Sequence, residues 1–373
     1  MKARIVVVLL VLAAACIDPI NFRVRDASGD LVVEAWVYDE AGSSYVRLSR
    51  TLPVGANPNF QAVSNASVVV VDESGIVNNF IETQQGVYEA EDPLFKGTVG
   101  SQYYLRITTA DNLVFESDPE EMQPSFEGTS LRAVYAPREF LTPAGNLSFE
   151  ILVDFLVDVQ KPADRNVYYK FDWEGTYNMV SPFQNLWDNC PAAELPDDYE
   201  IDFSLEFCYI TEQSPQSINI LSTEGFIGDV FRGHKLASLD PNKRFLFTYS
   251  MQAKQYSLSR RAYNYLKSIN DQASNVGGLF DPPPAMIPGN IRVLNDEDAK
   301  AFGFFFVSSV NRFRDFFDAS IVPVPLTHYE TCDCYPAVPA CLTGDEPDPV
   351  MPYCCDCRFL PNSTTVRPDY WIN

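Results

Sequence analysis

Residues 31–38 have the sequence Leu31-Val32-Val33-Glu34-Ala35-Trp36-Val37-Tyr38. β-Branched and aromatic side chains dominate this segment, and from Leu31 onward the hydrophobic period is two, which is typical of a β-strand. A second strand is predicted over residues 45–49, after an Asp-Glu-Ala-Gly turn. Further short strands are predicted at residues 66–72, 86–90, 103–109 and 113–117. Short strands separated by turn signals predict an immunoglobulin-like or transthyretin-like sandwich over residues 31–124.

A second β-rich domain is predicted over residues 125–321, because residues 147–155 and 167–174 alternate and residues 245–251 and 303–310 have strand composition. One helix is predicted over residues 258–275, with Ser257 as its N-cap and Gly277-Gly278 after its end. The irregular stretch 177–215 is long for a loop inside a compact domain, and such loops are usually functional or cross-linked. We expect its aromatic side chains to be exposed and to contact a ligand or a partner.

The composition fits this mainly β fold class. Of the 373 residues, 46% are hydrophobic, so the chain can bury one large core or two to three domains. Aromatic residues make up 13% and there are 27 prolines, which favours β-structure with many turns over helical bundles. The net charge of -23 argues against nucleic acid as a partner and against adsorption to anionic lipid headgroups.

The N-terminus has the features of a secretory signal peptide over residues 1–15. Basic residues precede an apolar run at residues 5–12, and Ala13-Ala14-Ala15 stands directly before Cys16. The apolar run is too short to span a bilayer, which takes about 20 residues. Because Ala-Ala-Ala-Cys resembles the bacterial lipobox, we expect lipid attachment at Cys16, a tether over residues 16–30 and a body outside the cytoplasm. The alternative is an ordinary cleaved signal with an incidental cysteine.

The cysteine count supports an oxidising compartment. The chain has 9 cysteines, and lipidation of Cys16 leaves an even number for disulfides. We expect Cys190 to pair with Cys208. In the Cys- and Pro-rich segment 322–373, neighbours such as Cys354 and Cys355 are poor partners. We therefore expect the first group to pair mainly with the second, the two groups being Cys332, Cys334 and Cys341, and Cys354, Cys355 and Cys357.

A metal site is the alternative interpretation of these cysteines, because Cys332-Asp333-Cys334 and Cys355-Asp356-Cys357 resemble two chelating arms. Zinc sites usually separate paired cysteines by two to four residues, whereas one residue separates these. Secretion also argues against it. We therefore expect no metal and no other cofactor.

Catalytic motifs are scarce. The chain has 2 histidines, His234 and His328, and neither lies beside a recognisable nucleophile motif. The sequence contains no P-loop and no dinucleotide fingerprint. The acidic runs 295–298 and 345–348 lack the spacing of an EF-hand, so solvated turns are the better interpretation of both. Among 50 acidic residues chance carboxylate pairs are inevitable. We expect no enzymatic activity and assign no catalytic residue.

Several segments resemble a known family when they are taken in order. They are residues 31–37, 46–51, Gln255-Tyr256-Ser257-Leu258-Ser259, Ala262-Tyr263, 278–284, Gly289-Asn290-Ile291, Gly303-Phe304-Phe305, Ser308-Ser309-Val310, 354–357 and 367–371. The order of these motifs is similar to that of an uncharacterised family of Bacteroidota outer-membrane lipoproteins, known only as a domain of unknown function. The resemblance covers nearly the whole mature chain. The genes of this family commonly neighbour TonB-dependent receptors of the SusC type.

The resemblance implies a role rather than a chemistry. We expect a lipid-anchored protein of the outer membrane that faces the cell surface. It would be a non-enzymatic accessory or ligand-binding subunit of a SusC-like TonB-dependent transporter. Its partners would be that barrel, the membrane and an unknown small ligand. The alternatives are a structural subunit of another outer-membrane machine, for barrel assembly or secretion, and a hydrolase of glycans or peptides.

Overall fold

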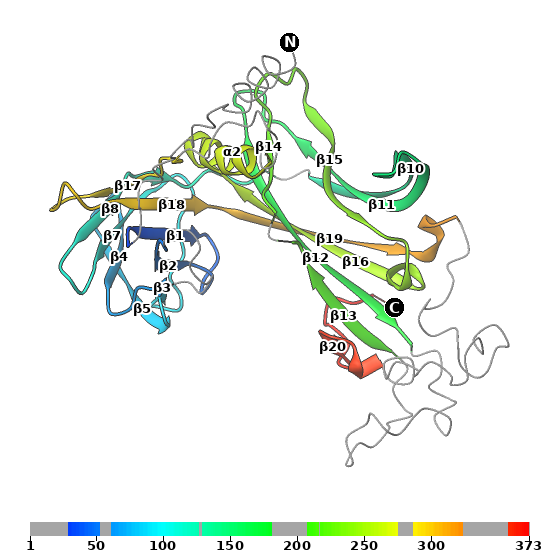
Figure 1. Cartoon of the computed structure of the whole chain (residues 1–373), viewed down its shortest axis with the longest axis horizontal. Coiled ribbons are helices and arrows are strands. Elements are labelled where there is room, and N and C mark those ends of the chain that lie inside the picture. Colours follow the sequence, from blue (N-terminus) through cyan, green and yellow to red (C-terminus); the bar gives the residue numbers. More distant parts are fainter. Residues whose placement is uncertain are drawn as a thin grey trace, which may run out of the picture.

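The computed structural model describes residues 29–52, 61–126, 129–180, 207–215, 217–274, 286–323 and 357–372. Within them the fold is mainly β, as predicted, and it forms two lobes with helix α2 beside the junction (Figure 1). The signal peptide, Cys16 and the tether up to residue 28 lie outside the described residues, so the predictions made for them stay predictions. None of the described helices is long and apolar enough to cross a membrane.

The first lobe is a sandwich built from one 11-stranded sheet, in the order β17-β8-β7-β4-β5-β6-β2-β1-β18, with β3 and β9 beside this path. The predicted strands are confirmed, and β5 was missed because most of its side chains are polar or exposed. The strands are β1 (Leu31–Tyr38), β2 (Tyr45–Arg50), β3 (Gln61–Ala62), β4 (Ser67–Asp72), β5 (Val77–Gln84), β6 (Val87–Ala90), β7 (Gln102–Thr108), β8 (Val114–Ser117), β9 (Glu120–Glu121), β17 (Ile291–Val293) and β18 (Ala301–Ser308).

Strand β1 is covered on both faces. Leu31, Val33 and Ala35 point into the sandwich core and are almost fully buried. Trp36 lies on the opposite face and belongs to a second apolar cluster, together with Phe306 of the neighbouring strand β18. Strands β1 and β18 are parallel, and Trp36 stands beside Phe306 in the register. The outer face of the first lobe is therefore a packing surface for the second lobe.

Strands β17 and β18 return to the first lobe from a segment far along the chain, which the predicted division at residue 124 did not anticipate. Asn290 joins the two ends of the sheet: its amide nitrogen donates to the Phe305 carbonyl (3.0 Å), and its oxygen accepts from the Phe305 N–H (2.8 Å). A Cβ at Gly289 would lie 1.6 Å from the Gly303 carbonyl oxygen, and a Cβ at Gly303 would lie 1.8 Å from that of Val33. Glycine is required at both positions because the backbones approach so closely.

The second lobe consists of two sheets that face each other across one aromatic-rich core, which includes Phe155 from one sheet and Tyr249 from the other. The sheet orders are β10-β11-β15 and β19-β16-β12-β13-β20, with β14 paired to β12. The strands are β10 (Ser130–Leu141), β11 (Leu147–Gln160), β12 (Tyr168–Met179), β13 (Cys208–Gln213), β14 (Asn219–Ser222), β15 (Val230–Leu239), β16 (Thr248–Ser257), β19 (Val310–Asp318) and β20 (Ser363–Thr364). Short 3-10 helices are η3 (Lys243–Phe245), η4 (Ala319–Ile321) and η7 (Cys357–Phe359).

The chain passes from one lobe to the other along β18 and β19, which follow each other almost without a break (Figure 1). Ser308 and Ser309 form the crossing, and both are fully buried. The Ser309 hydroxyl donates to the Gln123 carbonyl (2.6 Å), and the Ser309 carbonyl accepts from the Ser257 N–H (3.0 Å). The crossing is thus tied to both lobes.

The predicted helix is confirmed as α2 (Arg260–Ser274). Its N-cap is Ser259 rather than the predicted Ser257, because Ser257 is the last residue of β16. The Ser259 hydroxyl accepts from the Ala262 N–H (3.1 Å), as in a standard N-cap. Ala262 and Leu266 are buried, so this side of the helix packs on the protein.

The predicted pairing of Cys208 with Cys190 is wrong, as is the pairing of Cys357 within the C-terminal cluster. Cys208 forms a disulfide with Cys357, with Cα atoms 5.9 Å apart. The reason is that β20 pairs with β13 and brings the chain end back to Cys208. Trp371 packs edge-on against Tyr209, with ring centroids 5.1 Å apart. The remaining predicted disulfide residues lie outside the described residues: Cys190, Cys332, Cys334, Cys341, Cys354 and Cys355.

Candidate functional site

Two adjoining cavities lie where the outer face of the first lobe meets the second lobe. One has a volume of about 600 Å³ and extends to α2, while the other has a volume of about 840 Å³ and extends to β6 and to Ser214, Pro215, Ser217 and Ile218. Both are lined by Val32, Glu34, Lys170 and Asp172, so they form one continuous cleft. Ligand sites in proteins commonly have volumes of this order and commonly lie between domains.

The floor of the cleft is aromatic and rigid. The Trp36 ring stacks on Phe306, with centroids 4.0 Å apart, and on Tyr38, with centroids 5.6 Å apart. Phe304 stacks on Tyr265 of α2 at 4.9 Å. Trp36, Phe304 and Phe306 are buried, whereas Tyr38 and Tyr265 keep part of their surface in the cleft. A ligand would therefore contact the exposed parts of Tyr38 and Tyr265, whose rings are already held by stacking on Trp36 and Phe304.

Lys170 occupies the centre of the cleft. Lys170 and Asp172 are two residues apart on β12 and form an ion pair. The Lys170 ammonium also lies 4.7 Å from the ring centroid of Tyr256 and 5.9 Å from that of Trp36. These distances are within the range of cation–π attraction. The ammonium is thus held by one carboxylate and two aromatic faces.

Glu34 is the second carboxylate of the cleft. It accepts a hydrogen bond from the Tyr45 hydroxyl (2.7 Å) and one from Arg47 (2.7 Å). Burial, followed by the charge of Glu34, raises the pKa of Tyr45 above its usual value. Burial likewise raises the pKa of Tyr256. Both hydroxyls therefore stay protonated at neutral pH, and the Tyr45 hydroxyl keeps the hydrogen that it donates to Glu34.

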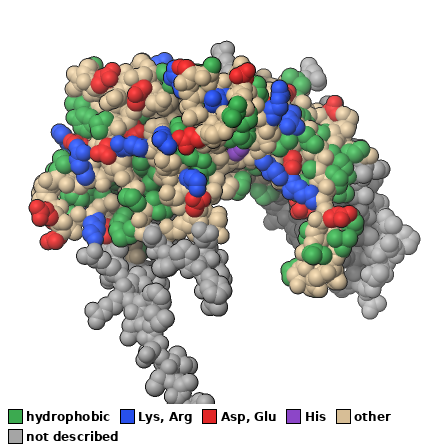
Figure 2. Space-filling model, turned by 90° about the horizontal axis from the view of Figure 1, so that it is seen from above, with side chains coloured by type: hydrophobic (Ala, Val, Ile, Leu, Met, Phe, Trp, Pro, Cys, Tyr) green, Lys and Arg blue, Asp and Glu red, His purple; other side chains and the backbone are tan. Residues whose placement is uncertain are grey.

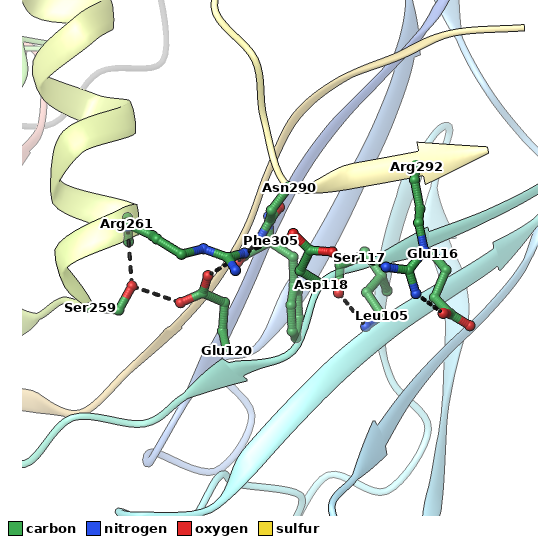
Figure 3. Close-up of polar contacts among 11 residues, drawn as sticks. Leu105, Glu116, Ser117, Asp118, Glu120, Ser259, Arg261, Asn290, Arg292 and Phe305 are labelled. Carbon is green, nitrogen blue, oxygen red and sulfur yellow. Dashed lines mark hydrogen bonds and ion pairs between the residues drawn. The ribbon is translucent and has the colours of Figure 1, made fainter. Parts of the chain in front are cut away.

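A polar network fixes the α2 wall of the cleft to the first lobe (Figure 3). The Ser259 hydroxyl donates to Glu120 (2.7 Å), and Arg261 forms ion pairs with Glu120 and Asp118, each at 3.1 Å. Arg292 of β17 joins the network through Asp118 (2.9 Å). Burial raises the pKa of Glu120. Because Ser259 caps α2, this network sets where the helix begins and where its side chains face the cleft.

The histidines and the acidic runs do not contribute to this cleft as far as the structure describes them. His234 packs against Phe171 at 5.2 Å, its Nε2 lies 2.6 Å from the Asn219 amide oxygen, and burial lowers its pKa to about 4. Residues 295–298 form the predicted turn, in which Asn295 binds the backbone of Asn112 and Val114. His328 and the run 345–348 lie outside the described residues.

The expectation of exposed aromatic side chains over residues 177–215 is wrong for Tyr177 and Tyr209, whereas Phe207 is partly exposed. Tyr177 is buried because β12 continues to Met179, and Tyr209 is buried on β13 under Trp371. Residues 181–206 of this stretch lie outside the described residues.

The cleft residues were missed by sequence reasoning, although a signal was present. Trp36 and Tyr38 occupy positions of β1 that alternation assigns to the outside, where polar side chains are usual. The run Phe304-Phe305-Phe306 is apolar on both faces of its strand. Both patterns are typical of strands that are covered on both sides.

The comparisons with known proteins identify the family. No curated protein matches the chain. Residues 17–314, which are most of the chain, match the family model described as a domain of unknown function, DUF4249. This match includes β1, α2, β18 and every residue named above as lining the cleft. The chain therefore belongs to the DUF4249 family, a domain of unknown function.

Proposed function

We propose that this protein is an outer-membrane lipoprotein, lipidated at Cys16, that works as a non-enzymatic ligand-binding subunit of a SusC-like TonB-dependent transporter. The cleft between the lobes is the site that would hold the ligand, and it is the observation that carries the proposal. The signal-like N-terminus and the resemblance to Bacteroidota lipoproteins support the location and the partner. The transporter would take up the ligand that this subunit presents.

The chemistry of the cleft suits the capture of a small molecule. A stacked aromatic floor provides apolar contact without the entropy cost of ordering flexible side chains. Glu34, Asp172 and Lys170 supply a few fixed polar contacts that would orient the ligand. Each of these charges is already paired, so binding would not leave a charge buried and alone.

The partner is tested by purifying the tagged protein from native outer membranes in mild detergent and identifying the proteins that accompany it by mass spectrometry. We expect a SusC-like barrel in near-stoichiometric amount. A partner set dominated by barrel-assembly or secretion factors would contradict the transport role and favour a structural subunit of those machines. Recovery of the protein alone, although it is lipidated, would also contradict it.

The cleft is tested by measuring thermal unfolding in the presence of a panel of defined sugars, peptides and metabolites. We expect a compound class that raises the melting temperature of the wild-type chain and of Lys254→Met but not that of Lys170→Met. Lys254 is the matched control because it lies on the adjacent strand β16 and pairs with Glu174 outside the cleft. Equal stabilisation of both variants would place the ligand elsewhere. Turnover of a panel compound would contradict the non-enzymatic role.

A further inference from the structure

The hairpin formed by β10 and β11 extends beyond the rest of its sheet. Strand β15 pairs with β11 only from Val153 to Gln160, whereas β10 and β11 pair with each other as far as Leu141 and Leu147. The outer part of the hairpin is thus a two-stranded ribbon. Strands β10 and β11 lie toward the right of Figure 1. On the same side, the space-filling view in Figure 2 shows a part of the molecule that projects beside a hollow.

The end of this ribbon is apolar, exposed and free of charge. Residues 140–149 contain no acidic or basic side chain, in a chain where 21% of the residues are charged. The exposed fractions of Phe140, Leu141, Leu147 and Phe149 are 44%, 70%, 59% and 68%. Leu141, Leu147 and Phe149 lie on the ribbon face that buries Phe155 and Val157 nearer the core. The apolar face of the sheet therefore continues past the end of the core that covers it.

Charges resume directly behind this tip. Arg138, Glu139 and Glu150 are the first charged residues on the two strands, and Arg138 stands opposite Glu150 in the register. Arg138 is also ion-paired with Asp154, which anchors it toward the lobe. The hairpin thus has an uncharged tip of residues 140–149, made of two or three residues of each strand and the turn between them, followed by a charged collar. At about 3.3 Å per residue the tip extends roughly 10 Å beyond the collar.

We propose that this tip inserts into the interfacial layer of a lipid bilayer. Moving a charged group into an apolar medium is costly. The tip carries no charge and can enter such a medium, whereas the charged collar would remain in water. Peripheral elements insert about 5–10 Å, which the tip can reach without immersing the collar. A rigid protein partner could bind this narrow tip only if it had a cavity of matching shape. A bilayer needs no such cavity, because its lipid chains rearrange around the tip.

The attraction is apolar rather than electrostatic. A net charge of -23 disfavours any anionic surface, so the contact relies on the tip side chains. Together with a lipid on Cys16, it would hold the second lobe at the bilayer and give the cleft a fixed orientation. The proposal itself does not depend on the transport role, since it rests only on the hairpin.

The test is flotation of the chain from residue 17 to 373, which contains every described residue and lacks the lipid, with phosphatidylcholine vesicles. We expect the wild-type chain to float with the vesicles, with little change in 0.5 M salt. Leu147→Ser with Phe149→Ser should bind at least about tenfold more weakly, since each exposed side chain contributes more than a factor of three. The matched control is Ile76→Ser with Val77→Ser, which removes apolar side chains that are 60% and 56% exposed on the first lobe. Equal binding by both double variants, or none by the wild type, would overturn the proposal.

A spectroscopic readout separates insertion from other contacts. Tryptophan placed in the tip by Leu147→Trp should show blue-shifted emission with vesicles and quenching by brominated acyl chains, whereas Ile76→Trp should show neither. Sedimentation velocity tests the alternative that the tip binds a second copy of the chain. Self-association that the tip substitutions abolish, without vesicle binding, would overturn the bilayer proposal and assign the tip to a dimer interface.

Discussion

The two lobes differ in how they bind the strands that come from a distant part of the sequence, which are β17 and β18 in the first lobe and β20 in the second. The first lobe binds β17 and β18 through close backbone packing, a buried side chain and core contacts: Gly289 and Gly303 let the strands touch, Asn290 bonds the Phe305 backbone, and the Phe305 ring lies in the core. The second lobe binds the chain end through a disulfide and through edge-on packing of Trp371 against Tyr209. The first closure therefore depends strongly on single atoms in a buried position. The second closure depends on a disulfide, which forms or breaks according to the redox conditions around the protein.

The largest effect is expected from Gly303→Ala in the first lobe. The added Cβ would lie 1.8 Å from the Val33 oxygen, and the residue has a φ of +100°, so the loss of unfolding free energy should be at least about 4 kcal/mol. The control is Gly75→Ala, where φ is +83° but the space is open. Chemical denaturation would compare them. If Gly303→Ala were as mild as its control, backbone contact would not hold this lobe.

Breaking the Cys208–Cys357 disulfide is expected to act on the second lobe only. Cys208→Ser with Cys357→Ser should cost about 3–4 kcal/mol of unfolding free energy, toward the upper end of the usual range for a disulfide because the bond closes a long loop. Hydrogen exchange measured by mass spectrometry should increase in β13 and β20 and stay unchanged in β1 and β18. An equal increase in both lobes would show that the two closures are not independent.

Asn290→Leu should cost about 2 kcal/mol in the first lobe, because the substitution leaves the buried N–H and carbonyl of Phe305 without partners. The matched control is Asn295→Leu, since Asn295 also bonds two backbone groups but is exposed. That variant should lose less than about 1 kcal/mol. Urea denaturation of both variants gives the comparison. Similar losses would mean that burial at Asn290 is unimportant.

The smallest effect is a difference in acid sensitivity between the lobes. Burial lowers the pKa of His234 to about 4, whereas in the unfolded chain it is about 6.5. The stabilisation is therefore complete above pH 6.5 and is lost as the pH falls toward 4, with roughly 1–2 kcal/mol lost at pH 5. His234→Gln should remove this part of the pH dependence. Hydrogen exchange at pH 5 and pH 7, with rates corrected for pH, would locate the effect in β15, and its presence in the first lobe would contradict the assignment.

The sequence predicted what depends on neighbours along the chain. Alternation placed β1 and β7, and helical spacing placed α2, because each pattern is complete within a few residues. The parallel pairing of β1 with β18 was not predictable, since nothing near Leu31 indicates which distant strand will lie beside it. The Cys208–Cys357 link was missed for the same reason, with a sequence separation of 149. The cleft escaped prediction because Trp36 and Lys170 acquire their roles only when the lobes meet.

The buried crossing at Ser308 and Ser309 has a mechanical consequence. A strand that runs through both lobes, and is bonded to each, acts as a beam rather than a hinge. The lobes should therefore not open and close around a guest in the manner of a clam shell. The width of the cleft at Trp36 is therefore the same before and after binding, so we expect the protein to select ligands by their size and shape. Entry should be as fast as diffusion and side-chain motion allow.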